Sequence, residues 1–209
     1  MRLVAESFAW PFRHASASTW IAGLVAVLLL PLLFIPLLGY AIAATRAAEG
    51  GATGPPGWRL DVRLLADGFW TALAILVTLV PFAVALNPLA AAMHFLKEPY
   101  AHVIAFFVLA LLWGLVALLF LPHATAAFAA SGSPRDMFNA AAAWRGVRAG
   151  FMTWNVAVAA IVTAWAIAVA CVGLLCVGFV PGMFYAILVS AHAAAALHHQ
   201  ATSQGPSAR

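Results

Sequence analysis

Four long intervals without a formally charged side chain constrain this sequence more than any other feature. A charge at the centre of a bilayer costs about 2.5–3.5 kcal/mol on insertion scales, so uncharged intervals of this kind are typical of membrane-spanning helices. The intervals lie between Arg13 and Arg46, between Asp67 and Lys97, between Glu98 and Arg135, and between Arg148 and Arg209.

The composition excludes a soluble globular domain. Hydrophobic residues make up 66% of the 209-residue chain and charged residues 8%, and the mean hydropathy is +1.02. Soluble domains carry about 25% charged residues, and a soluble fold of this size has too little interior to hide so much apolar surface. We therefore expect an all-α, polytopic integral membrane bundle that forms one transmembrane domain over residues 1–209.

The intervals predict five transmembrane helices, since a helix needs about 20 residues to cross the hydrocarbon layer. The last interval is too long for one helix, and Gly178, Pro181 and Gly182 supply a break within it. Asn87-Pro88 is expected to end or kink the second span. The predicted spans are residues 20–44, 69–86, 100–121, 154–177 and 180–199.

Short amphipathic helices are expected at the membrane surface, where aromatic rings and arginines are both well solvated. One is predicted over Arg59–Asp67 and another from Ser133-Pro134, which carry helix-start signals. The expected interfacial anchors are Trp10, Arg13, Trp58, Trp70, Trp144, Arg145, Arg148 and Trp154.

The distribution of Lys and Arg predicts an orientation. With five spans, most of the 10 Lys and Arg residues fall on the side of the C-terminus. The positive-inside rule then favours a cytoplasmic C-terminus and an external N-terminus in the cell inner (cytoplasmic) membrane. The arginines form no basic run, so we expect no nucleic-acid partner.

Several interface and turn residues resemble those of a known family. The segment Phe8-Ala9-Trp10-Pro11-Phe12-Arg13 is followed by Leu38-Gly39-Tyr40 and Arg46, then by Trp58-Arg59-Leu60 and Asp67-Gly68-Phe69, and late in the chain by Ser190-Ala191-His192. This pattern resembles the start, first linker and end of prokaryotic membrane proteins grouped as domain of unknown function 4013. The resemblance implies a multi-spanning architecture and assigns no activity and no catalytic residue.

Histidine is the residue type that most invites a ligand-binding interpretation. His192 has apolar neighbours and is the best single candidate for a tetrapyrrole ligand; His94 with His102, and His192 with His199, have spacings that place each pair on one helix face. The alternative is that these are interfacial side chains at span ends, which is the more common role. We expect no bound metal or cofactor.

No catalytic residue is predicted. The six carboxylates all lie in predicted linkers, so no acid–base pair or proton relay lies within a span. No nucleotide-binding, nucleophile-elbow or zinc-protease motif occurs in the chain. We therefore expect a protein that is not an enzyme.

An alanine stripe marks the fourth predicted span. Ala160, Ala164 and Ala168 follow the small-xxx-small spacing that lets helices approach closely in lipid. The stripe serves either internal packing or contact with a partner, and the sequence leaves both possibilities open.

Two functional hypotheses follow. The first is an accessory or structural subunit that packs against a larger membrane protein complex and contacts membrane lipids. The second is a small permease or channel for a neutral or lipidic solute, in which Pro31, Pro36 and Pro81 break the spans around a cavity. In the second case Thr78, Asn87 and Asn155 should line that cavity.

Overall fold

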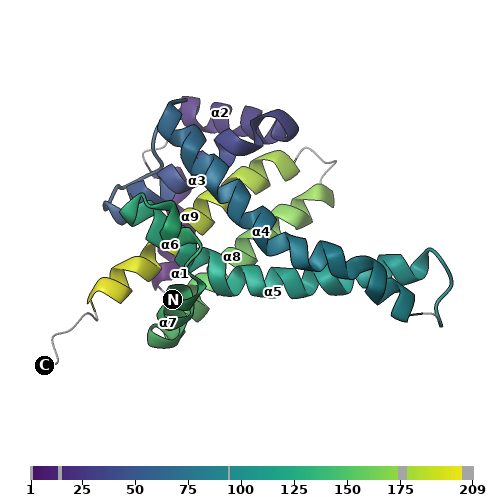
Figure 1. Ribbon diagram of the computed structural model, residues 1–209. Coiled ribbons are helices and arrows are strands. Elements are labelled where there is room, and N and C mark those ends of the chain that lie inside the picture. Colours follow the sequence, from purple (N-terminus) through teal and green to yellow (C-terminus); the bar gives the residue numbers. More distant parts are fainter. Residues whose placement is uncertain (1, 14–15, 94, 174–177, 204–209) are drawn as a thin grey trace, which may run out of the picture.

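The computed structural model describes residues 2–13, 16–93, 95–173 and 178–203, without the side chains of residues 172 and 199–203. In this part of the chain all regular structure is helical (Figure 1). The elements are α1 (Arg2–Ala9), η1 (Trp10–Phe12), α2 (Ala17–Leu28), α3 (Leu30–Glu49), α4 (Val62–Ala92), α5 (Tyr100–Ser131), α6 (Pro134–Met137), α7 (Ala140–Ala149), α8 (Phe151–Ala170), η2 (Cys171–Gly173) and α9 (Phe179–Ser203).

Five helices are long and apolar enough to cross a membrane: α3, α4, α5, α8 and the Phe179–His198 part of α9. Such segments satisfy their backbone hydrogen bonds internally, which the hydrocarbon layer requires. The predicted fold class, a polytopic helical membrane bundle, is therefore confirmed.

The first predicted span, residues 20–44, is not one helix. α2 ends at Leu28, Leu29 has φ −96° and ψ 32°, and a second non-helical residue, Leu33, follows within α3. Pro31 and Pro36 account for both breaks, because a proline ring removes an N–H donor and clashes with the carbonyl of the preceding turn.

α2 and α3 form a hairpin in which the start of α2 and the end of α3 lie on the same side of the molecule. Trp10 donates from Nε1 to the carbonyl of Ala52, just beyond α3, at 2.9 Å. Phe12, two residues on, stacks on Trp20 in the first turn of α2 with ring centroids 5.5 Å apart. The start of α2 is therefore held close to the end of α3, on which α2 also packs.

The N-terminal segment, residues 2–13, lies beside the later half of α9. Ser7 Oγ is 2.9 Å from His192 Nδ1, and farther along α9 His198 Nδ1 is 3.8 Å from Glu49 Oε1. The N-terminal segment and the later half of α9 therefore lie side by side, whereas five successive spans would place the first and last segments on opposite sides of a membrane.

Other boundaries also differ from expectation. The separate helix predicted over Arg59–Asp67 is instead the start of α4, which Asp61 caps by accepting from the Leu64 N–H. α4 continues through Pro88 to Ala92. The helix expected from Ser133 is divided into α6 and α7, and α8 ends at Ala170, before the predicted break.

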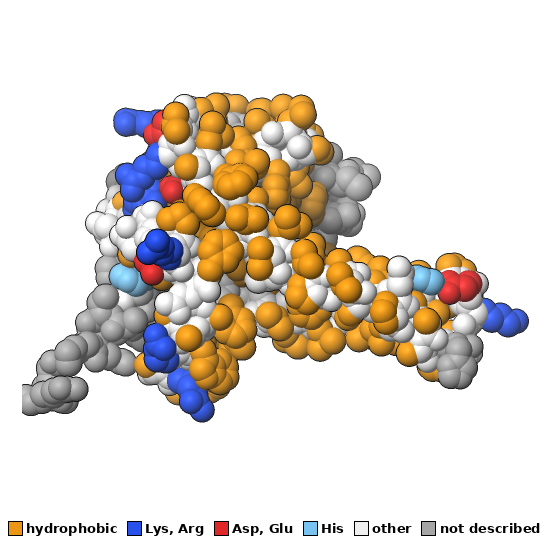
Figure 2. Space-filling model, in the orientation of Figure 1, with side chains coloured by type: hydrophobic (Ala, Val, Ile, Leu, Met, Phe, Trp, Pro, Cys, Tyr) orange, Lys and Arg blue, Asp and Glu red, His pale blue; other side chains and the backbone are white. Residues whose placement is uncertain are grey.

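α4 and α5 form a long hairpin that extends away from the other helices (Figure 1). In Figure 2 its flank is apolar, and acidic and basic side chains gather at its tip and along the opposite edge of the molecule. We call that opposite edge the charged end; the ends of α3, α5 and α9 and the start of α4 meet there through the contacts of Arg46 and Glu49.

Candidate functional site at the α3–α4 crossing

α3 and α4 touch backbone to backbone at two glycines. A Cβ on Gly39 would lie 1.9 Å from the carbonyl oxygen of Leu64, and one on Gly68 would lie 2.0 Å from that of Ile35. Real Cβ atoms do not approach so closely, so only glycine permits this crossing. It brings the last turns of α3 against the first turns of α4.

An ion pair fastens the same crossing on its polar side. Arg46 donates from both terminal nitrogens to Asp67 Oδ2 at 3.1 Å, and from Nε to the carbonyl of Ala129 at 3.0 Å. The Asp67 side chain is 9% exposed and that of Arg46 27%. Arg46 therefore joins α3, α4 and the end of α5, and its fork geometry suits this use.

Tyr40 and Trp58 hold the connecting loop over the crossing. Their rings stack with centroids 4.3 Å apart and planes 3° apart, and the Tyr40 hydroxyl donates to the carbonyl of Pro56 at 2.9 Å. Trp58, a predicted interfacial anchor, is half-buried, and its buried Nε1 has no hydrogen-bond partner among the described residues.

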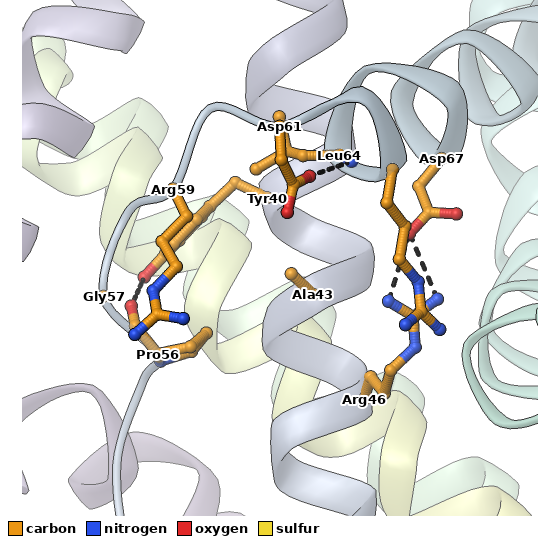
Figure 3. Close-up of a pocket in the computed structure, with 10 residues that line it drawn as sticks. Tyr40, Ala43, Arg46, Pro56, Gly57, Arg59, Asp61, Leu64 and Asp67 are labelled. Carbon is orange, nitrogen blue, oxygen red and sulfur yellow. Dashed lines mark hydrogen bonds and ion pairs between the residues drawn. The ribbon is translucent and has the colours of Figure 1, made fainter.

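A pocket of about 370 Å³ opens between α3, the loop and the start of α4 (Figure 3). In the close-up Arg59 lies on one side, the Arg46–Asp67 pair on the other, and Asp61 between them. Its lining residues are Tyr40, Ala43, Arg46, Pro56, Gly57, Arg59, Asp61, Arg63, Leu64 and Asp67.

His192 belongs to a separate contact between the N-terminal segment and α9. Its Nδ1 is bonded to Ser7, which is fully buried, and its ring lies against Trp10 with centroids 5.4 Å apart. These contacts give the ring a packing role and occupy one of its two nitrogens. Trp10, expected as an interfacial anchor, is only 2% exposed and belongs to the core.

The other predicted anchors have mixed surroundings. Trp144 is exposed, with the Arg148 guanidinium 5.4 Å from its ring centroid, as expected of a surface helix. Trp70 and Trp154 are half-buried, and Trp154 stacks on Phe151. Arg13, Arg145 and Arg148 are exposed.

The alanine stripe is internal. Ala160, Ala164 and Ala168 are all 0% exposed and pack against α9, where their neighbours include Ala193 and Val189. Of the two possibilities that the sequence leaves open, these contacts support internal packing.

The predicted histidine pairs find no support as a metal site. His94 and the side chain of His199 lie outside the described residues, and His102 bonds Glu98 Oε2 at 2.7 Å. Over the residues that the structure describes, no group of three or more His, Cys, Asp or Glu is arranged to hold a metal ion.

None of the central residues of the crossing is predicted as a site from the sequence alone. Gly39, Arg46, Asp67 and Gly68 all occur among the residues that carry the family resemblance, as do Tyr40 and Trp58. Their common place in the family resemblance is the sequence feature that could have identified them as a site. The structure shows that these residues contact one another.

Comparison with protein-family models gives a match over most of the chain. The family described as "Protein of unknown function (DUF4013)" matches residues 23–189, which is most of the chain. No curated protein and no solved structure matches it.

Proposed function

The chain belongs to the family described as "Protein of unknown function (DUF4013)", and because that description assigns no activity, we propose from its geometry that it is an accessory subunit of a larger membrane protein complex. In this proposal the chain has no enzymatic activity. Its partner is another integral membrane protein whose apolar helices pack against the α4–α5 hairpin.

The observation that carries this proposal is the unsupported outer half of the α4–α5 hairpin. Between Ala74 and Ala90 no residue of α4 is buried. On α5 the residues buried in the same half are Ala101, Ala105 and Leu109, which share the face directed at α4. The outer faces of both helices are therefore left uncovered by the part of the chain that the structure describes.

Lipid tails are sufficient to solvate such an apolar surface, so its exposure does not by itself require a partner protein. Helices in membranes associate through close packing rather than through the hydrophobic effect, and a hairpin supported only at its base leaves most of its packing surface unused. The outer face of α5 also offers a small site: a Cβ on Gly114 would meet nothing within 4 Å, and the neighbouring Leu111 and Leu115 are exposed. Large side chains beside a small residue suit the packing of a partner helix.

We also propose that the charged end faces the cytoplasm, in the inner membrane of a prokaryotic cell. The segment between α4 and α5, at the tip of the hairpin, holds one Lys, Lys97, and no Arg, and Figure 2 shows Lys and Arg side chains gathered along the charged end. The positive-inside rule supports this orientation. In this proposal the C-terminus, which follows α9, is cytoplasmic.

A photo-crosslinking experiment tests the partner. A photoreactive amino acid replaces Val84 or Leu111 on the hairpin, or Ile21 on α2 as an exposed apolar control. After irradiation of native membranes we expect Val84 and Leu111 to give a discrete protein adduct that mass spectrometry identifies, and Ile21 to give lipid adducts. Lipid adducts alone at all three positions, with a lone chain recovered in mild detergent, would refute the proposal.

The alternative, a small permease or channel, gains no support from the polar groups on which it depends. The Thr78 hydroxyl and the Asn155 amide bond backbone carbonyls of their own helices, at Ile75 and Phe151. Asn87 and Asn155 are exposed, and none of the three lines the pocket described above. Flux of a neutral or lipidic solute through vesicles that contain only the purified protein would nevertheless support the permease or channel.

A further inference from the structure

The pocket at the α3–α4 crossing is lined by more charge than its own ion pair uses. Arg46 and Asp67 neutralise each other. Arg59 and Arg63 are exposed and make no hydrogen bond or ion pair with any residue that the structure describes. Asp61 uses Oδ1 to cap α4, and its second oxygen is not bonded. Two guanidinium groups and one carboxylate oxygen are thus free for a ligand.

The same segment presents apolar side chains away from the pocket. Arg59 and Asp61 line the pocket, whereas Leu60 and Val62 are 71% and 83% exposed. The Asp61 N–H donates to the carbonyl of Arg59 at 3.1 Å and closes a tight turn at Leu60. With this turn ahead of α4, Arg59 and Asp61 line the pocket while Leu60 and Val62 stay exposed. A soluble anion would make no contact with these apolar side chains, whereas the acyl chains of a lipid would pack against them.

We propose that this pocket binds the phosphodiester head of a membrane phospholipid whose head group also carries an N–H or O–H donor. Arg59 and Arg63 bind the phosphate oxygens, since guanidinium groups form charge-assisted pairs with phosphate. Asp61 accepts a hydrogen bond from the amine or hydroxyl of the head group. The acyl chains follow Leu60 and Val62 toward the hydrocarbon layer.

The dimensions and position of the pocket fit this ligand. Its volume of about 370 Å³ lies within the range of roughly 300–1,000 Å³ that is usual for small-molecule sites. It is lined by Arg46 and Asp67, whose contacts define the charged end, and in this proposal the charged end meets the head-group layer. This proposal does not depend on the partner proposed for the α4–α5 hairpin, because the two surfaces lie on different parts of the molecule.

Native mass spectrometry of the full chain in detergent tests the site. Phosphatidylethanolamine, phosphatidylglycerol and phosphatidylcholine with identical acyl chains are titrated separately, and inorganic phosphate is added as a competitor. We expect the first two lipids to bind about tenfold more tightly than phosphatidylcholine, whose head group has no donor for Asp61. Inorganic phosphate at millimolar concentration should not displace them.

Four variants separate this site from general charge attraction. Arg59→Gln with Arg63→Gln should reduce binding of phosphatidylethanolamine to the level of phosphatidylcholine, and Arg59→Lys with Arg63→Lys should recover part of it. Asp61→Asn should narrow the difference between the two lipids. Arg145→Gln, which removes an exposed arginine on α7, should change nothing.

Three results would overturn the proposal: equal affinity for phosphatidylcholine, displacement by inorganic phosphate, or an equal loss with Arg145→Gln. Each variant must elute from size exclusion as the wild type does. If the glutamine pair fails that check, Asp61→Asn decides the question, because its expected effect is on head-group preference and not on overall binding.

Discussion

At the scale of single residues, Gly68 is one of the two positions where the α3–α4 crossing leaves no room for a side chain. An added methyl would meet the backbone oxygen of Ile35, which cannot rotate away as a side chain can. Overpacking of this kind costs about 1–3 kcal/mol, and the gain of about 1 kcal/mol in helix propensity from glycine to alanine offsets only part of it.

Gly68→Ala should therefore lower the free energy of unfolding by about 1–2 kcal/mol. Titration of the purified protein with a denaturing detergent, followed by circular dichroism or fluorescence, measures this change. Gly114→Ala is the matched control, because its Cβ would meet nothing within 4 Å; it should be neutral or slightly stabilising. Equal effects at the two positions would show that the crossing is not tightly packed.

Asp67 is the second residue on which the crossing depends. Asp67→Asn removes the charge that Arg46 binds and leaves a partly buried guanidinium without a counter-ion. Breaking a buried pair costs about 3–5 kcal/mol, and the 27% exposure of Arg46 places the expected loss near the lower limit, at about 3 kcal/mol.

The same detergent titration measures this loss. Glu6→Gln serves as the comparison, since it breaks the exposed Arg2–Glu6 pair and should leave stability unchanged. The double variant Arg46→Gln with Asp67→Asn completes the test. If Arg46→Gln lowers the free energy of unfolding as much in the Asp67→Asn background as it does alone, the two residues act independently, and the pairing is contradicted.

At the scale of whole helices, the sequence located the second, third and fifth spans, although α4 (Val62–Ala92) and α5 (Tyr100–Ser131) extend beyond the predicted 69–86 and 100–121. It located the first span poorly. The uncharged intervals place α4, α5 and α9 because the energetic cost of a charge in lipid is local and additive. Pro31 and Pro36 also indicate that the first predicted helix is interrupted, but a proline by itself specifies only the interruption. Whether the chain then kinks or turns back depends on contacts such as Trp10 with Ala52, which join residues distant in sequence.

The candidate site shows the same limit. Gly39 and Gly68 each read as an ordinary small residue, and only their contact in space gives them a role. The unbonded arginines of the pocket could not be distinguished by sequence from Arg46, which is paired. Composition and spacing therefore define which segments enter the membrane, and tertiary contacts define the site.

The α8–α9 interface provides a prediction at this scale. Ala164 is fully buried against α9, and Ala166, two residues along the same helix, is exposed. Ala164→Leu should destabilise the protein by about 1–3 kcal/mol because the added carbons have no space, whereas Ala166→Leu should have no effect. Thermal unfolding monitored by size exclusion compares the two, and a similar midpoint for both would place the stripe outside the interface.

At the scale of the whole molecule, the α2–α3 hairpin decides the topology. If it returns to the charged end, then residues before α2, the loop after α3 and the connection between α5 and α8 share one side, and the tip of the α4–α5 hairpin lies on the other. If residues 20–44 crossed the membrane instead, the start of α2 would lie on the side of the hairpin tip. Single-cysteine labelling separates these two arrangements.

The experiment begins with Cys171→Ala and Cys176→Ala, which remove both native thiols. Ser18→Cys, Thr53→Cys, Ala149→Cys and Lys97→Cys are then introduced separately, all at exposed positions. A membrane-impermeant maleimide, applied to intact cells and to inverted vesicles, should label Ser18→Cys, Thr53→Cys and Ala149→Cys only in the vesicles, because the arginine-rich side faces the cytoplasm. Lys97→Cys should react only in intact cells. Labelling of Ser18→Cys from the same side as Lys97→Cys would exclude the hairpin, and reversal of the entire pattern would keep the hairpin but invert the proposed orientation.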